Sequence, residues 1–131
     1  MSESFQEVFD TLKPVFEEYA GRLAIQVDKP GQYYLETKTA AASGPYKGRR
    51  LQFGGVKIGK AYVSFHLMPV YASSELSQSI SPELKKRMQG KSCFNFKTPD
   101  QKLFKELAQL TKAGFEKFND PEFLQKIFQN E

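Results

Sequence analysis

Positions 49–71 alternate apolar and polar residues on both sides of Gly59-Lys60, which restricts this part of the chain to a half-buried β-hairpin. Eight apolar residues share one face and would build a hydrophobic core: Leu51, Phe53, Val56, Ile58, Ala61, Val63, Phe65 and Leu67. The other face is polar, basic and aromatic, and it holds Arg50, Gln52, Lys57, Tyr62, Ser64 and His66. A core does not require this second face, so it is the first place to look for a ligand site.

Glycines mark the two irregular points of this hairpin. Gly59-Lys60 predicts a tight turn in which the glycine adopts a positive φ. Gly54-Gly55 interrupts the alternation, because Phe53 and Val56 both belong to the apolar face although they are three positions apart. One extra residue in the strand restores the register, so a β-bulge that bends the sheet is predicted there.

A chain of 131 residues with 40% hydrophobic and 26% charged residues has the size and composition of a single globular domain. Cys93 is the only cysteine, so an internal disulfide is excluded, and a single thiol suits a reducing cytoplasm. The first residues do not resemble a secretory signal, and no apolar run approaches the roughly 18 residues of a membrane span. We therefore expect one domain over residues 1–131, located in the cytoplasm and independent of membranes.

Helical and extended segments follow one another along the rest of the chain. The predicted segments are a helix over 4–20 that Pro14 kinks or breaks, strands over 22–28 and 32–37, a loop over 38–48, a short helix over 83–89, a strand over 91–97, a long helix ending near 118 and a final short helix after Asp120-Pro121. Ser81-Pro82 and Thr98-Pro99 are signals of helix N-termini. This order predicts an α+β fold: a bent antiparallel sheet of about five strands, with the N-terminal helix and the long C-terminal helix packed on one face.

Two stretches carry a resemblance to a known family. The strand exit FHLMPVY at 65–71 is followed by ISPELKKRMQGKSCFNFKTPD at 80–100, which leads into the long helix. In this order of elements, over roughly residues 50–118, the chain resembles the YdhG-like family of small uncharacterised α+β domains. The resemblance implies the fold given above. Some members are regarded as frataxin-like iron chaperones, and the family has no agreed catalytic motif that could be assigned to residues of this chain.

His66 and Cys93 are the residues with the most reactive side chains, and each has two interpretations. His66 is suited to be a general base, a metal ligand or a hydrogen-bond donor, or it is a structural or merely exposed histidine. Cys93 lies between lysine-containing flanks that favour a thiolate, although a buried small apolar residue explains the same position. No nucleophile motif surrounds them, and two such ligands are too few for structural zinc. We predict no catalytic residue and no cofactor, with a small enzyme using His66 as acid or base as one alternative.

The first predicted helix is acidic. Residues 1–20 contain five acidic side chains against Lys13 alone, in a chain of net charge +4. Four of them fall close to one helical face: Glu3, Glu7, Asp10 and Glu17. Clustered carboxylates bind hard cations, so a frataxin-like iron-binding chaperone that uses this row is a second alternative function. A solvated helix face explains the same spacing, and Pro14 interrupts the row.

Aromatic rings beside basic side chains suit an anionic small molecule or a stacked base. The predicted ligand site combines the polar hairpin face with its rim: Arg50, Tyr62, His66, Tyr71 and Lys91. A nucleic acid partner is not expected, since no RNP-type glycine–aromatic motif is present. Residues 66–71 line a pocket mouth or a homodimer contact, or they close the end of the core. The leading hypothesis is a non-enzymatic binding module for a small anionic ligand; a polar face that is covered by a second layer or simply solvated is the alternative.

Overall fold

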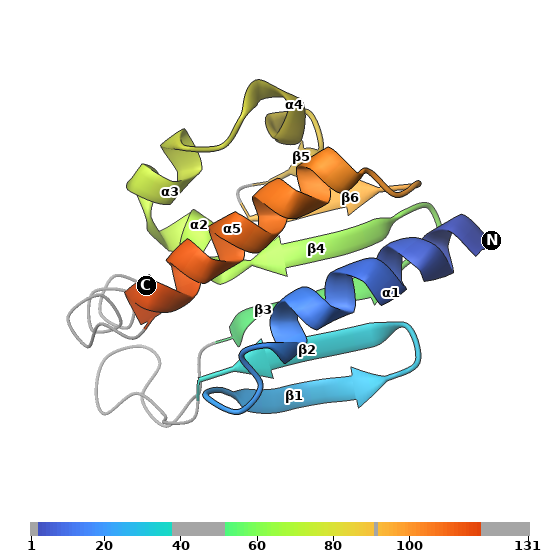
Figure 1. Cartoon of the computed structure of the whole chain (residues 1–131), viewed down its shortest axis with the longest axis horizontal. Coiled ribbons are helices and arrows are strands. Elements are labelled where there is room, and N and C mark those ends of the chain that lie inside the picture. The colour runs from blue at the N-terminus through green and yellow to red at the C-terminus, as the bar shows by residue number, and fades with distance from the viewer. Residues whose placement is uncertain (1–2, 38–51, 91, 119–131) are drawn as a thin grey trace.

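The structure, a computed structural model, describes residues 3–37, 52–90 and 92–118. Figure 1 shows its helices and strands in chain order. These elements are α1 (Glu3–Glu17), β1 (Ala24–Lys29), β2 (Gln32–Glu36), β3 (Gln52–Ile58), β4 (Val63–Leu67), α2 (Met68–Ala72), α3 (Ser74–Gln78), α4 (Pro82–Lys85), β5 (Met88–Gln89), β6 (Cys93–Phe96) and α5 (Gln101–Phe118). No helix in the described ranges has both the length and the apolar character needed to cross a lipid bilayer.

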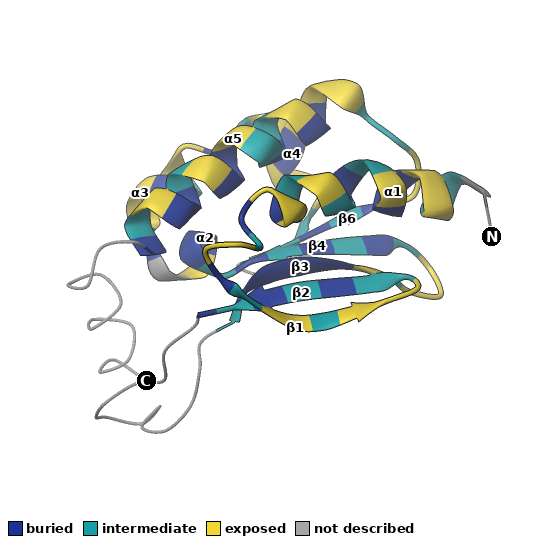
Figure 2. Cartoon of the chain, turned by 60° about the horizontal axis from the view of Figure 1, so that its bottom comes forward, coloured by how far each residue is buried: buried dark blue, intermediate teal, exposed yellow. Residues whose placement is uncertain are grey.

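The strands form one antiparallel sheet in the order β1-β2-β3-β4-β6-β5. The helices lie together on one side of this sheet, as Figures 1 and 2 show from two directions. The predicted α+β fold is confirmed, with α1 and α5 on the same face. The strand beyond the expected five is β5, which has two residues and pairs with β6 through a turn at Gly90, where φ is 78°.

Aromatic side chains fill the space between the helices and the sheet. Phe16 of α1 is fully buried, stacks on Phe65 of β4 at a centroid distance of 4.7 Å and meets Phe53 of β3 edge-on at 6.2 Å. The absence of a side chain at Gly54 permits this contact, since a Cβ atom there would lie 2.8 Å from Cε1 of Phe16. The core therefore depends on close approach of α1 to the backbone of β3.

The hairpin between β3 and β4 differs from its prediction at the turn. The last cross-strand pair is Ile58 with Val63, and the N–H of Gly59 donates to the carbonyl oxygen of Tyr62 at 2.9 Å. The loop thus has four residues, and Gly59 does not have a positive φ, so the predicted two-residue turn is wrong. Ala61 lies in this loop and is exposed, because the strand that was expected to bury it begins two residues later.

The predicted bulge is present but displaced by one residue. Gly54 pairs with Leu35, and the next pair joins Gln52 to Glu36, so Phe53 is the extra residue opposite β2. Pairing of β3 with β4 is regular from Gly54 to Ile58. The bulge turns Phe53 onto the helical side, where it is fully buried. Leu51, also expected on that side, lies outside the described residues, as do the 38–48 loop and the helix after Asp120.

The helices differ from the predictions mainly at their ends. Helix α1 continues through Pro14, because the apolar face on both sides of the proline, including Leu12 and Phe16, is buried against the sheet. Ser81 caps α4 as predicted, by accepting from the N–H of Leu84 at 3.2 Å. This helix ends at Lys85, because the residues after it pair with β6.

The N-cap of α5 is Asp100 and not Thr98. Its carboxylate accepts from the N–H of Leu103 at 3.1 Å, and the helix starts at Gln101. Aspartate is as good a cap as threonine or better, so the residue next to the helix takes the role. The short helices α2 and α3 were not predicted, since segments of five residues carry little periodicity.

Candidate functional site

The sheet face opposite the helices is polar and aromatic, and we call it the outer face. All described helices lie on the other side of the sheet (Figure 2), so none of them covers it. The residues on this face are identified by alternation and cross-strand pairing: Tyr34, Gly55, Lys57, Tyr62, Ser64, His66, Gln89, Cys93 and Asn95. The predicted separation of an apolar and a polar face is therefore confirmed for β3 and β4.

A row of directly paired residues crosses the middle of the outer face. Tyr34 is opposite Gly55, Gly55 is opposite His66, and His66 is opposite Cys93. The Tyr34 ring lies over Gly55, because a Cβ atom built at that glycine would overlap Cδ1 of the ring. A phenol, an imidazole and a thiol thus lie along one line across four strands.

His66 is half-buried at the centre of this row. Its Nδ1 atom lies 3.1 Å from Oγ of Ser92 and 3.4 Å from Sγ of Cys93. Burial lowers the pKa of His66 below its ordinary value of 6.5. The imidazole is therefore neutral at pH 7. Its Nε2 atom has no hydrogen-bond partner in the parts of the chain that the structure describes.

Cys93 and Tyr34 are also uncharged at neutral pH. Burial raises the pKa of the Cys93 thiol, and the neighbouring Ser92 side chain opposes this only in part. Burial raises the pKa of Tyr34 as well, and the neighbouring Cys93 adds to the effect. The raised pKa does not favour the thiolate that the lysine-containing flanks of Cys93 had suggested. The other interpretation, a fully buried cysteine, does not hold either, because Cys93 is half-buried.

A second group of polar side chains adjoins the row at β4, β5 and β6. Tyr62 and Asn95 both donate to Oε1 of Gln89, at 2.9 and 2.6 Å, and Ser64 donates to Oδ1 of Asn95 at 3.1 Å. The two N–H groups of the Gln89 amide have no partner among the described residues. The network holds these side chains in fixed orientations on the sheet surface.

The structure brings together two of the five residues predicted to bind a ligand. His66 projects from β4 onto the outer face, and Tyr62, the residue before β4, donates to Gln89 on the same face. Tyr71 lies in α2, which packs against α5 on the helical side, and its side chain is 48% exposed. Arg50 and Lys91 fall outside the described residues. The ligand site itself stays a prediction.

Residues 66–71 lead from the sheet into α2. Leu67 and Val70 are buried in the core, with 0% and 1% of their surface exposed, so they close the end of the core as one interpretation proposed. Pro69 packs against α5, where a Cβ atom at Gly114 would lie 2.9 Å from the proline ring. A homodimer contact in this region stays a prediction.

The acidic residues of α1 are engaged locally or directed to solvent. Asp10 accepts from Gln6 at 2.9 Å, and Glu17 lies 4.0 Å from the ammonium of Lys13. Within the described ranges, no three histidine, cysteine, aspartate or glutamate side chains lie close enough to hold a metal ion. The side chain of Glu3 is not described. The iron-binding alternative therefore finds no support in the arrangement of the described side chains.

Several outer-face residues were absent from the predicted site. Cys93 and Asn95 alternate with buried Phe94 and Phe96, so the pattern of β6 already contained their orientation. Gln89 was assigned to a helix, which hid its position opposite Cys93. No local sequence pattern indicated the contact between His66 and Ser92, because 26 positions separate the two residues.

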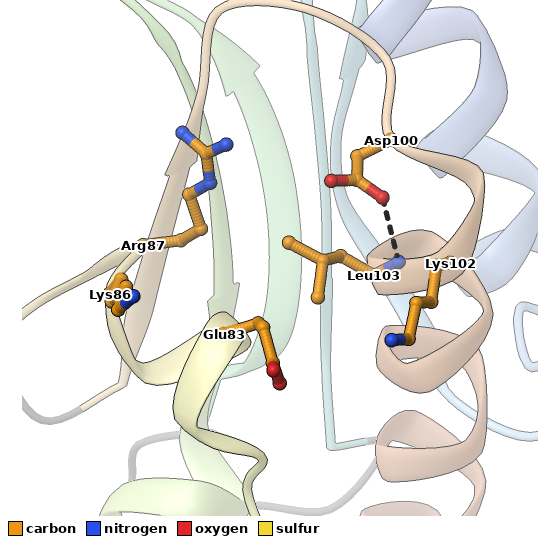
Figure 3. Close-up of a pocket in the computed structure, with 6 residues that line it drawn as sticks. All are labelled: Glu83, Lys86, Arg87, Asp100, Lys102 and Leu103. Carbon is orange, nitrogen blue, oxygen red and sulfur yellow. Dashed lines mark hydrogen bonds between the residues drawn. The ribbon is translucent and has the colours of Figure 1, made fainter.

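A cavity of about 430 Å³ lies between α4, the start of β5 and the N-terminus of α5. Figure 3 shows the residues that line it: Glu83, Lys86, Arg87, Asp100, Lys102 and Leu103. Arg87 lies over the Phe96 ring at 5.9 Å from its centroid. Three cationic side chains here face two carboxylates, one of which caps α5, so the opposite charges offset one another.

No protein-family model, curated protein or solved structure matches this chain. The resemblance to the YdhG-like family therefore stays a prediction, and the case for function depends on the outer face and the cavity themselves.

Proposed function

We propose that the protein is a non-enzymatic binding module that takes a small anionic molecule on the outer face of its sheet. The observation that carries the proposal is that hydrogen-bond donors of Gln89 and Lys57 on this face have no partner among the described residues. The Gln89 carbonyl oxygen already accepts two hydrogen bonds, whereas its amide N–H groups are unpaired among the described residues. Such a surface is complementary to a ligand rich in oxygen acceptors.

Charge favours the same class of ligand. Lys57 is exposed on the outer face next to Ser64, and no acidic residue pairs with it in the described parts of the chain. The chain as a whole has a net charge of +4. A phosphate or carboxylate group accepts charge-assisted hydrogen bonds, each worth about 1.5–3 kcal/mol.

A binding role fits the His66–Cys93 pair better than nucleophilic catalysis does. The nucleophile in cysteine chemistry is the thiolate, and an adjacent imidazolium stabilises it. Here burial raises the pKa of Cys93 and lowers that of His66, so both groups are held in their neutral forms. A neutral pair is suited to hydrogen bonding.

Titration with phosphate, citrate and adenosine monophosphate, followed by amide chemical shifts and by thermal unfolding, tests the proposal. We expect saturable shifts at β4, β5 and β6 and a rise in melting temperature, because a ligand that binds only the folded state stabilises it by mass action. His66→Phe is expected to weaken the affinity roughly 10-fold or more, since one charge-assisted hydrogen bond is lost.

Two matched variants locate the site. Arg87→Ala removes the guanidinium of the cavity in Figure 3, and Lys112→Ala removes an exposed cation on α5; neither residue is on the outer face. Both variants are expected to bind the three anions as the unmodified protein does. Loss of binding in Arg87→Ala together with retention in His66→Phe would assign the anion to the cavity and overturn the proposal.

A further inference from the structure

The two neighbours of Nδ1 in His66 both carry a hydrogen. Ser92 has a hydroxyl at 3.1 Å, and Cys93 has a thiol at 3.4 Å. A neutral imidazole has one nitrogen that donates and one that accepts, and the partners of one nitrogen decide which is which. Because the hydroxyl and the thiol can both donate to Nδ1, this nitrogen is suited to be the acceptor.

The other tautomer makes poorer use of the same contacts. With a hydrogen on Nδ1, the Ser92 oxygen could accept it, but the imidazole N–H and the Cys93 S–H would meet across 3.4 Å, and sulfur accepts hydrogen bonds only weakly. With Nδ1 unprotonated, the hydroxyl and the thiol can both donate to its lone pair. The raised pKa of Cys93 keeps its thiol protonated at neutral pH, so this donor is present.

We propose that Ser92 and Cys93 hold His66 in the tautomer that carries its hydrogen on Nε2, which makes this histidine a hydrogen-bond donor on the outer face. The functional consequence of this tautomer rests on the proposed function: in the proposed ligand site, Nε2–H of His66 is a third N–H donor group beside those of Lys57 and Gln89. The site then selects ligands that present a carboxylate, phosphate or carbonyl oxygen. It disfavours ligands whose only polar group is a cation or a donor.

Ser92 and Cys93 act in this arrangement as positioning residues and need not touch the ligand. Their hydrogen bonds also fix the orientation of the ring, so Nε2 keeps one direction. A donor of fixed direction binds an anion more tightly than a rotating one, because less conformational entropy is lost on binding.

Nitrogen-15 NMR of the histidine side chain tests the proposal directly, because the shifts of Nδ1 and Nε2 report which nitrogen carries the hydrogen. His66 is the sole histidine, so its signals are assigned without ambiguity. We expect the Nε2–H tautomer in the unmodified protein at pH 7.5. In the double variant Ser92→Ala, Cys93→Ala we expect a mixture of both tautomers and a phosphate affinity lowered several-fold.

Cys93→Ser is the matched control, since it keeps a donor next to Nδ1, and it is expected to retain the Nε2–H tautomer. An Nδ1–H tautomer in the unmodified protein would overturn the proposal, and so would an unchanged tautomer in the double variant. These results do not depend on ligand binding. If the unmodified protein shows the Nε2–H tautomer but binds none of the three anions, the proposed function fails while the role of Ser92 and Cys93 stands.

Discussion

At the scale of single residues, His66 has an uncharged imidazole in a half-buried position on the outer face. Its neutrality follows from burial, which disfavours the charged form more than any described neighbour favours it. A neutral donor discriminates between ligands by hydrogen-bond direction, and a cation such as Lys57 attracts any anion at a distance. In the proposed binding role, affinity and selectivity would thus come from different side chains.

Stability should depend on the protonation of His66. Its folded-state pKa lies below the unfolded value of 6.5, so the unfolded chain binds a proton first as the pH falls. The free energy of unfolding is therefore expected to decrease from about pH 7 downward in the unmodified protein, relative to His66→Phe. Urea unfolding of both proteins at a series of pH values measures the difference. A constant difference over this range would contradict the lowered pKa.

At the scale of secondary-structure elements, the site depends on how β2 and β3 approach each other. Gly55 leaves room above the β3 backbone, and the Tyr34 ring of β2 occupies it. The ring covers backbone that the glycine would otherwise expose, at the residue that pairs with His66. A glycine in the interior of a strand usually weakens that strand. Gly55 has a structural role here, because only a residue without a side chain lets the Tyr34 ring pack on the backbone.

Gly55→Ala should disturb both the sheet and the site. The new Cβ atom would overlap the Tyr34 ring and the backbone oxygen of Tyr33, and overpacking of this kind costs about 1–3 kcal/mol. Gly21→Ala is the control, because a Cβ atom there meets nothing within 4 Å, and it should be neutral or stabilise the fold by at most about 1 kcal/mol. Thermal unfolding compares the two. Equal melting temperatures would show that Tyr34 does not lie over Gly55.

At the scale of the whole molecule, the helices and the aromatic core lie on one side of the sheet. The helices bury the aromatic core there, and the polar outer face faces away from them (Figure 2). Substitutions of core side chains such as Phe16 should therefore alter stability, whereas substitution of an exposed outer-face side chain such as Lys57 should leave stability nearly unchanged and weaken the proposed binding.

Phe16→Ala tests the contribution of the core. The side chain is fully buried between Phe53 and Phe65, and its removal leaves a cavity that costs about 3–5 kcal/mol. This is a large part of the roughly 5–15 kcal/mol that stabilises a typical domain. Ile25→Ala on β1, where the side chain is 51% exposed, should change stability by about 0.5 kcal/mol or less. Urea unfolding gives both values, and a small effect of Phe16→Ala would contradict the packing of α1 on the sheet.

The features that could be predicted from the sequence are those that depend only on residues close together in the chain. The alternation along β3 and β4 assigned buried and polar faces correctly, apart from the bulge at Phe53, because successive side chains in a strand point to opposite sides. The Ser81 cap was also predictable, since a cap acts within three residues of itself. The α+β class followed from the order of these elements.

Only the tertiary structure decided which polar residues meet. Strand order places Cys93 and Ser92 against His66, and pairing of β2 with β3 places the Tyr34 ring over Gly55. It also placed Gln89 in a strand, although its local sequence had suggested a helix. The alternation restricts the register of a strand but does not say which distant strand it pairs with, because that choice depends on the packing of the entire core. The sequence thus determined that the face around His66 is polar, and the fold decided which hydrogen-bonding groups that face offers to a ligand.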